Sequence, residues 1–213
     1  MKTMIAIPCM DTVPTRFASS LLRMRRTPEA AVVFGMNSLI YDTRNKAAME
    51  AIQGGFDRVL WLDSDMEFQP DLMERLSARM DEGRDFVTGL YFQRKDPFKP
   101  VIYRELYIRQ REDGAQEAVS EACEEFPPDG IFEVAACGFG IAMTSVQLLR
   151  DVTEKYGMPF TPIEGWGEDL AFCLRATDAG YRIWCDSSIR AGHIGLKTFY
   201  EEDWRRVQTK LRL

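Results

Sequence analysis

Four short apolar segments, separated by stretches with helical spacing, constrain the fold of this chain more than any other feature. The segments cover residues 4–7, 30–34, 58–62 and 85–92. Such runs are typical of strands that are buried on both faces of a sheet. Helices are expected between them over 15–24, 43–53 and 70–83, and Asp42 is the expected N-cap of the second. The alternation predicts an α/β fold with a mixed, mostly parallel central sheet flanked by helices on both faces.

The pattern changes after residue 95. A segment over 96–134 holds four prolines and an acidic run, with a short strand or hairpin expected around Tyr103–Ile108. Further elements are expected as a strand over 131–137, helices over 144–156 and 168–180, a strand over 182–185 and a helical tail over 198–213. A chain of 213 residues fits one domain, so we expect a single domain with halves over about 1–95 and 96–197.

Composition excludes several classes of function. The chain has 33 acidic and 27 basic residues, and a net charge of -6 weighs against nucleic acid as the main partner. The five cysteines include no CxxC pair, which favours reduced thiols over a zinc or disulfide framework. We find neither a signal peptide nor an apolar run of about 18 residues, so a cytoplasmic protein without a transmembrane segment is expected. The oligomeric state is left open.

An acidic pair directly follows the third apolar segment, in Asp63-Ser64-Asp65. Carboxylates at the end of a buried strand are costly unless a cation or hydrogen-bond donors meet them. In an extended backbone the two side chains would lie about 7 Å apart on one face. Ligands of open α/β sheets bind at this end of the strands, so the pair is a candidate site for a divalent ion and a hydroxyl. A solvated turn with two capping aspartates is the alternative.

A second acidic pair and a single histidine complete the set. Glu168 and Asp169 follow the glycine loop 165–167 at an expected helix N-terminus, where the helix dipole favours ionised carboxylates. One could orient a hydroxyl while the other removes its proton, although plain helix capping is the alternative. His193 lies between Gly192 and Gly195, where it could bind a metal or be an ordinary loop histidine. An acidic pocket of this kind needs a metal to hold an anionic substrate.

In combination these residues resemble a known family. The segments 60–66 (LWLDSDM) and 165–175 (GWGEDLAFCLR), with His193 24 residues after Asp169, are similar to the GT-A superfamily of nucleotide-sugar glycosyltransferases, in particular its family 2-like inverting enzymes. Arg44-Asn45 also resembles the start of the family's helix before the DxD strand. The resemblance implies a Rossmann-like GT-A domain, with a nucleotide-binding half over 1–95 and an acceptor and catalytic half over 96–197.

The resemblance also implies a role for each residue. Asp169 would be the catalytic base, and Glu168 would orient the acceptor or the donor sugar. Asp65 and His193 would hold a divalent metal, manganese or magnesium, with Asp63 facing the metal or the ribose. The remaining donor contacts would come from Pro8, Cys9, Asp11, Asn37, Arg44, Ser64 and Gly138, and Trp166 could stack on an acceptor sugar. The donor would be a nucleotide-diphosphate sugar, with UDP implied by resemblance alone; the acceptor is unknown.

Two features depart from the family. The chain is short, and the QxxRW motif is absent, since no Arg-Trp follows Gln208. Both argue against a processive polysaccharide synthase. Three other functions are considered: a haloacid dehalogenase-type phosphatase, a sugar nucleotidyltransferase and a non-catalytic nucleotide-sugar-binding module. The phosphatase usually carries its DxD after the first strand, whereas here it follows the third.

Overall fold

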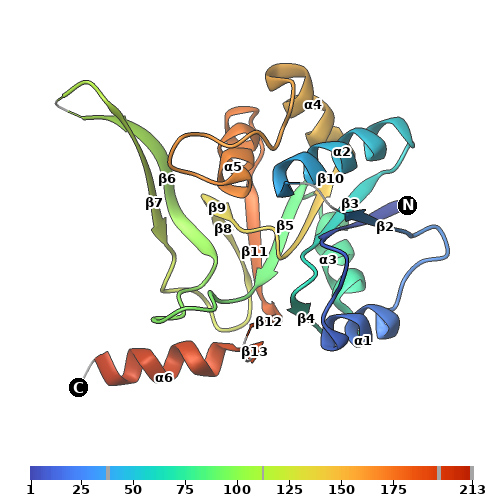
Figure 1. Cartoon of the computed structure of the whole chain (residues 1–213), viewed down its shortest axis with the longest axis horizontal. Coiled ribbons are helices and arrows are strands. Elements are labelled where there is room, and N and C mark those ends of the chain that lie inside the picture. Colours follow the sequence, from blue (N-terminus) through green and yellow to red (C-terminus); the bar gives the residue numbers. More distant parts are fainter. Residues whose placement is uncertain (37–38, 112, 196–197, 212–213) are drawn as a thin grey trace.

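A seven-stranded sheet crosses the molecule in the order β2-β1-β3-β10-β5-β11-β8 (Figure 1). The computed structural model describes residues 1–36, 39–111, 113–195 and 198–211. The strands are β1 (Thr3–Cys9), β2 (Ala31–Met36), β3 (Arg58–Leu62), β5 (Phe86–Leu90), β8 (Ile131–Val134), β10 (Ile141–Ser145) and β11 (Ile183–Arg190). Five of them run in one direction, while β10 and β8 are antiparallel to their neighbours. The predicted α/β class with a mixed, mostly parallel sheet is therefore confirmed.

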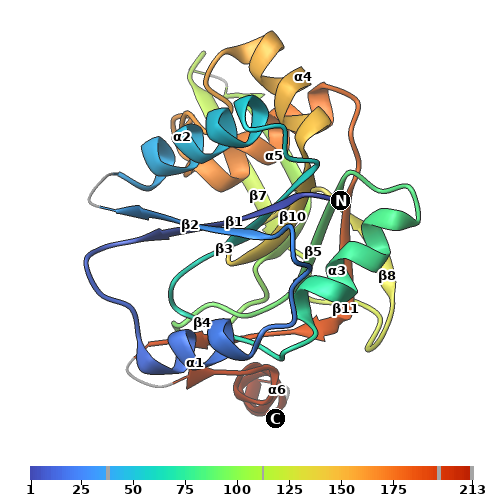
Figure 2. The same cartoon turned by 90° about the vertical axis from the view of Figure 1, so that its right-hand side faces the viewer.

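Helices cover both faces of this sheet, as Figure 2 shows from the side. On one face lie α2 (Ile40–Gln53), α4 (Val146–Tyr156) and α5 (Glu168–Asp178). On the other lie α1 (Thr15–Arg23) and α3 (Leu72–Asp81). The prediction that Asp42 caps α2 is wrong: Leu39 is the N-cap, and Asp42 lies in the first turn. A carboxylate in that turn still complements the helix dipole.

Two small sheets flank the large one. The first pairs β13 (Thr198–Phe199), β12 (Gly192–Ile194) and β4 (Met66–Glu67). The second pairs β7 (Gln116–Ala122), β6 (Ile102–Gln110) and β9 (Ala136–Cys137), and its β6–β7 hairpin projects from the body of the molecule (Figure 1). The predicted hairpin near 103–108 is thus present. The single strand predicted over 131–137 is wrong, because the chain divides it between β8 and β9 in different sheets.

The last helix, α6 (Glu201–Leu211), begins later than the helical tail predicted from residue 198, because β13 comes first. Its Trp204 is buried and packs against Phe92, with ring centroids 5.5 Å apart, and against Phe126. The helix therefore closes over the end of β5. None of the helices in the described ranges is long and apolar enough to cross a membrane.

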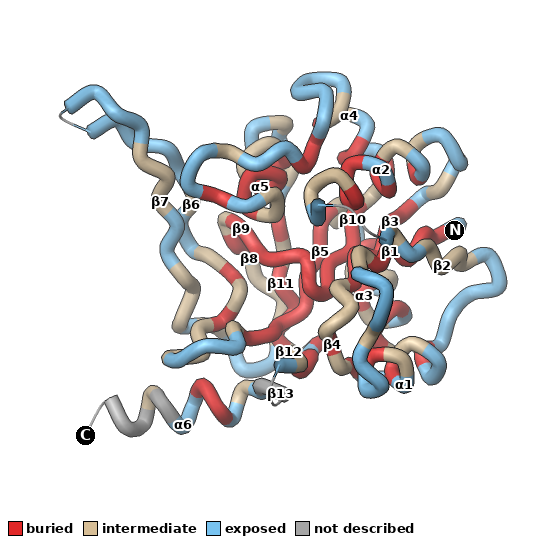
Figure 3. The backbone as a smooth tube through the Cα atoms, viewed as in Figure 1, coloured by how far each residue is buried: buried red, intermediate tan, exposed pale blue. Residues whose placement is uncertain are grey.

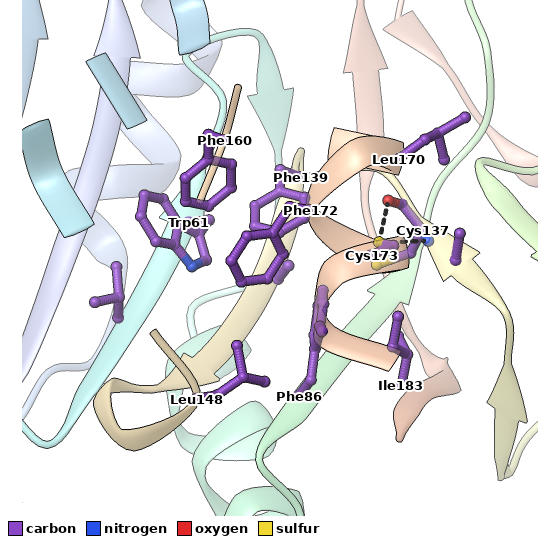
Figure 4. Packing of buried hydrophobic residues seen from close by; sticks show 14 of the residues in the cluster. Trp61, Phe86, Cys137, Phe139, Leu148, Phe160, Leu170, Phe172, Cys173 and Ile183 are labelled. Atoms are coloured by element: carbon purple, nitrogen blue, oxygen red, sulfur yellow. Dashed lines mark hydrogen bonds between the residues drawn. The ribbon is translucent and has the colours of Figure 1, made fainter. Parts of the chain in front are cut away.

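The core lies along the middle of the sheet, where the buried residues of Figure 3 are concentrated. An aromatic cluster packs between the sheet and α5: Trp61, Phe86, Phe139, Phe160 and Phe172 (Figure 4). The Trp61 indole N–H donates to Thr144 Oγ1 at 2.9 Å, so its one polar atom is satisfied inside the core. The cluster reaches the end of β3 through Trp61, which belongs to that strand.

Candidate functional site

The chain turns immediately after β3 instead of continuing as a strand. The N–H of Met66 donates to the carbonyl of Asp63 at 3.3 Å, and the N–H of Asp63 donates to Gly140 O at 3.0 Å. The carbonyl of Asp65 accepts from the N–H of Ile194 at 2.7 Å, which ties the turn to β12. The extended geometry expected for this acidic pair is therefore wrong, and the turn directs the two carboxylates to different partners.

Asp63 is bound by Arg44 of α2. Arg44 Nη2 donates to Asp63 Oδ1 at 2.6 Å, and Arg44 Nη1 donates to Glu168 Oε1 at 2.8 Å. The Arg44 side chain is only 2% exposed, and its guanidinium lies over the Phe139 ring, 5.0 Å from the centroid. Arg44 thus connects the end of β3 to the start of α5. It fixes two carboxylates, and it also lines a cavity between β1, β2 and α2; the donor contact that the resemblance implies for Arg44 stays a prediction.

Arg44, Asp63 and Glu168 form a charged triad, and burial has the largest single effect on the pKa of each group. It raises the pKa of Asp63 in spite of the neighbouring Arg44. Burial also raises the pKa of Glu168, although the Arg44 charge opposes it. Burial alone would lower the pKa of Arg44, but the charges of Asp63, Glu168 and Asp169 raise it. Two carboxylates at this position are therefore compatible with folding because a permanent cation lies between them.

A pH-dependent stability follows from Glu168. Because its folded-state pKa is raised, its favourable contribution is present below its unfolded pKa of about 4.3 and is lost as the pH rises through the folded value. We expect the free energy of unfolding of the wild type, relative to Glu168→Gln, to fall between pH 4 and pH 7. Urea unfolding of both proteins across this range measures it. A difference that is flat or rises with pH contradicts the assignment.

Asp65 lies on the other side of the turn and meets two potential cations. Its Oδ2 is 2.9 Å from Arg94 Nη1 and 3.5 Å from His193 Nε2. Burial would raise the pKa of Asp65, but the hydrogen bond from His193 and the charges of His193 and Arg94 outweigh it and lower the pKa. The other histidine nitrogen, Nδ1, is 2.9 Å from the carbonyl of Phe92, and the Tyr91 ring packs against the imidazole.

The Asp65–His193 pair fits one part of a metal site. With Nδ1 at the Phe92 carbonyl, Nε2 faces Asp65 Oδ2; a metal ligand would keep the Nδ1–H···O=C bond and replace the Nε2 proton with the ion. Two ligand atoms that each lie about 2.1 Å from the same ion are roughly 3–3.5 Å from each other. The distance of 3.5 Å between Asp65 Oδ2 and His193 Nε2 is within that range. No group of three or more His, Cys, Asp or Glu side chains in the described ranges is placed to hold an ion. Asp63 therefore does not form a three-ligand set with this pair, and of its two expected roles, at the metal or at the ribose, only the second stays a prediction.

A cavity of about 560 Å³ lies in front of these residues. The site residues predicted from the sequence that line it are Pro8, Asp63, Ser64, Asp65, Asp169 and His193. Asp169 is half-buried in the first turn of α5, and its Oδ1 accepts from the N–H of Leu170 at 2.8 Å. The structure thus brings together acids from β3 and α5 with the histidine of β12. A second cavity of about 200 Å³, between β1, β2 and α2, adjoins it at Pro8.

Several predicted residues lie elsewhere. Cys9 is half-buried at the end of β1, and Asp11 is exposed in the loop after it; neither lines the cavity. Asn37 lies outside the described residues. The Trp166 side chain is buried in the hydrophobic core, 7% exposed, so it packs within the protein and offers no face for stacking.

The side chain of Tyr91 leaves no room for a Cβ at Gly138. A Cβ at this position would lie 2.1 Å from the Tyr91 hydroxyl, which accepts a hydrogen bond from the N–H of Gly140 at 3.1 Å. The glycines at 138 and 140 therefore leave room for the Tyr91 ring, and neither lines the cavity; the donor contact that the resemblance implies for Gly138 stays a prediction.

Gly138→Ala should consequently displace Tyr91 and cost about 1–3 kcal/mol of stability. Because the shortest contact is with the hydroxyl, Tyr91→Phe in the Gly138→Ala background should recover part of that loss, while the contact with Val101 Cγ1 at 2.7 Å remains. Chemical denaturation of the two single variants and the double variant tests this coupling. Strictly additive effects would show that the clash does not determine the cost.

The sequence patterns did not predict six residues that line the cavity: Ile40, Tyr91, Gln93, Arg94, Lys95 and Val101. Tyr91, Gln93, Arg94 and Lys95 directly follow β5. The rule that ligands bind beyond the carboxyl ends of parallel strands applies to β5 as well as to β3, and it was the signal that could have found them.

Comparison with known proteins gives the fold but no function. No family model matches the chain, and no curated protein matches it. The chain shares its fold with A197 from STIV. The two are 22% identical, the match covers 92% of this chain and 86% of that chain, and the TM-score is 0.65. At this identity the likeness is evidence for the fold alone.

Proposed function

We propose that this chain is a metal-dependent glycosyltransferase with a GT-A fold. It would move a sugar from a nucleotide-diphosphate sugar to an acceptor hydroxyl, with inversion by single displacement. One observation carries the proposal: Asp65, His193 and Asp169 line a single cavity at the carboxyl end of β3, together with Arg94 and Lys95. Acids and cations that line one cavity suit a site where a diphosphate leaves and a hydroxyl loses a proton.

Asp65 and His193 are the residues that would hold the divalent ion, Mn²⁺ or Mg²⁺. Such an ion neutralises the diphosphate as it leaves. Asp169 would accept the proton of the acceptor hydroxyl, since it lines the same cavity and its second carboxylate oxygen has no described partner. Glu168, fixed by Arg44 at 2.8 Å, would orient Asp169 and the start of α5.

The adjoining 200 Å³ cavity would receive the nucleoside. Its walls are largely apolar, from Ala6, Ile7, Val33 and Ala47, and it opens toward the metal pair at Pro8. A flat base fits between such walls, while the diphosphate reaches the larger cavity. UDP is the donor nucleotide implied by resemblance.

The alternative functions have less support. In a phosphatase of the haloacid dehalogenase type, the first aspartate of the DxD is the nucleophile, but Asp63 is held by the buried Arg44. A sugar nucleotidyltransferase would need a glycine-rich phosphate loop after the first strand, and Pro8–Thr12 contains no glycine. A non-catalytic binding module would not require the Asp169 carboxylate at the cavity.

Thermal denaturation with a panel of nucleotides, each with and without Mn²⁺, tests the donor site. UDP or GDP with Mn²⁺ should raise the melting temperature by about 5–10 °C near a hundredfold excess over Kd. Asp65→Ala and His193→Ala should abolish this shift. Glu67→Ala is the matched control, because Glu67 follows the same turn but binds Tyr200 at 2.8 Å and does not line the cavity. If no nucleotide–metal pair shifts the wild type, the donor site is wrong.

A further inference from the structure

Arg94 contacts the same oxygen that the proposed metal would need. Its Nη1 is 2.9 Å from Asp65 Oδ2 and donates to the carbonyl of Ile194 at 3.0 Å. His193 Nε2 is 3.5 Å from that same oxygen. A guanidinium and a divalent cation at one carboxylate oxygen repel each other, since like charges a few ångströms apart cost free energy even in a polar site. Arg94 must therefore leave Asp65 before a metal can bind.

Once Arg94 leaves Asp65, its guanidinium is free to bind another anion. Only Nη1 is engaged; no partner for Nη2 or Nε is seen among the residues that the structure describes. The side chain is 47% exposed, so its movement does not disturb the core. A guanidinium presents parallel N–H groups that match two oxygens of a phosphate.

The loop that carries Arg94 is held against the cavity. The N–H of Gln93 donates to Lys99 O at 2.9 Å, and the N–H of Phe98 donates to Lys95 O at 2.7 Å. Lys95 lines the same cavity, and within the described part of the chain its ammonium has no ion pair or hydrogen bond. Arg94 and Lys95 thus line the same cavity as the carboxylates of Asp63, Asp65 and Asp169, although the chain as a whole is acidic.

We propose that Arg94 exchanges partners when the donor binds. In the free protein it neutralises Asp65; on donor binding it yields Asp65 to the metal and, with Lys95, contacts the diphosphate. This inference rests on the proposed function and adds a diphosphate-binding residue to it. It also implies that metal and nucleotide bind cooperatively, because the diphosphate draws Arg94 away from the oxygen that the metal takes.

Three matched variants test the exchange: Arg94→Met, Lys95→Met and Lys99→Met. Manganese binding without nucleotide is followed by the electron paramagnetic resonance of free Mn²⁺, and UDP binding at saturating Mn²⁺ by calorimetry. Arg94→Met should bind Mn²⁺ alone about tenfold more tightly and UDP about tenfold more weakly. Lys95→Met should weaken the binding of UDP and leave the binding of Mn²⁺ unchanged. Lys99→Met should change neither, because Lys99 pairs with Glu124 at 2.7 Å away from the cavity.

The opposite signs for Arg94→Met separate exchange from a general loss of positive charge. Manganese affinity equal to that of the wild type, including no binding by either protein, overturns the competition at Asp65. Unchanged UDP affinity overturns the diphosphate contact. A wild type that binds neither UDP nor GDP with Mn²⁺ refutes the proposed function instead, while the measurement with Mn²⁺ alone still decides whether Arg94 competes for Asp65.

Discussion

Asp169→Asn is expected to slow sugar transfer about 10²–10⁴-fold, the range typical for loss of a general base. The amide has nearly the same shape, and its oxygen can still accept from the N–H of Leu170, so the start of α5 should keep its geometry. What it cannot do is take the proton of the acceptor hydroxyl. Steady-state kinetics with a nucleotide-sugar donor measures the rate, and thermal shifts with nucleotide and Mn²⁺ should match those of the wild type.

The matched control for this prediction is Asp178→Asn at the other end of the same helix. Asp178 pairs with Lys155 and Tyr156 on the surface, so its loss should leave turnover near the wild-type value. A variant Asp169→Asn that retains more than about a third of the rate would remove Asp169 as the base. Loss of nucleotide binding in that variant would mean that Asp169 contributes to the donor site.

Arg44→Met should have the largest effect on stability. It leaves Asp63 and Glu168 close to Asp169 without the cation that separates them, and breaking a buried ion pair in this way costs about 3–5 kcal/mol. For a chain of this size that corresponds to roughly 6–20 °C in melting temperature. Turnover should also be lost, because Glu168 no longer fixes the start of α5. Calorimetry and kinetics measure the two effects.

Two further variants keep this prediction testable if Arg44→Met fails to fold. Arg44→Met combined with Glu168→Gln removes one unpaired carboxylate and should recover part of the stability. Arg58→Met removes another buried arginine, but its partner Asp81 is 61% exposed and water replaces the lost contact. Its cost should be smaller, and turnover should persist. If Arg44→Met and Arg58→Met lower the melting temperature equally, the two carboxylates beside Arg44 do not cause the cost.

The sequence predicted most elements of the first ninety residues because their signals are local. The strand over 58–62 has the bounds expected from its apolar run, and the acids that follow it do line a cavity. The strand β10 was missed, since Thr144 and Ser145 were assigned to the helix that follows. Its insertion between β3 and β5 depends on pairing between distant segments, which periodicity does not encode.

The same limit applies to the site. The acidic pairs and His193 could be found from the sequence, because glycine loops and strand ends mark them. The partners of those acids could not: Arg44 joins Glu168, 124 residues away, and Arg94 meets Asp65 only because a loop after β5 folds back. Trp166 shows a different error, since the resemblance implied that its ring could stack on an acceptor sugar, whereas the core buries it.

The central claim is that this site breaks the bond between a sugar and a nucleoside diphosphate. The most direct test incubates the wild type with Mn²⁺ and nucleotide sugars in ¹⁸O-labelled water, with water as a slow acceptor, and follows the products by ³¹P NMR and mass spectrometry. We predict that the nucleoside diphosphate is released without label and that the sugar carries ¹⁸O at its anomeric carbon. A nucleoside monophosphate with a sugar phosphate, label in the phosphate, or no donor cleavage at all would contradict it.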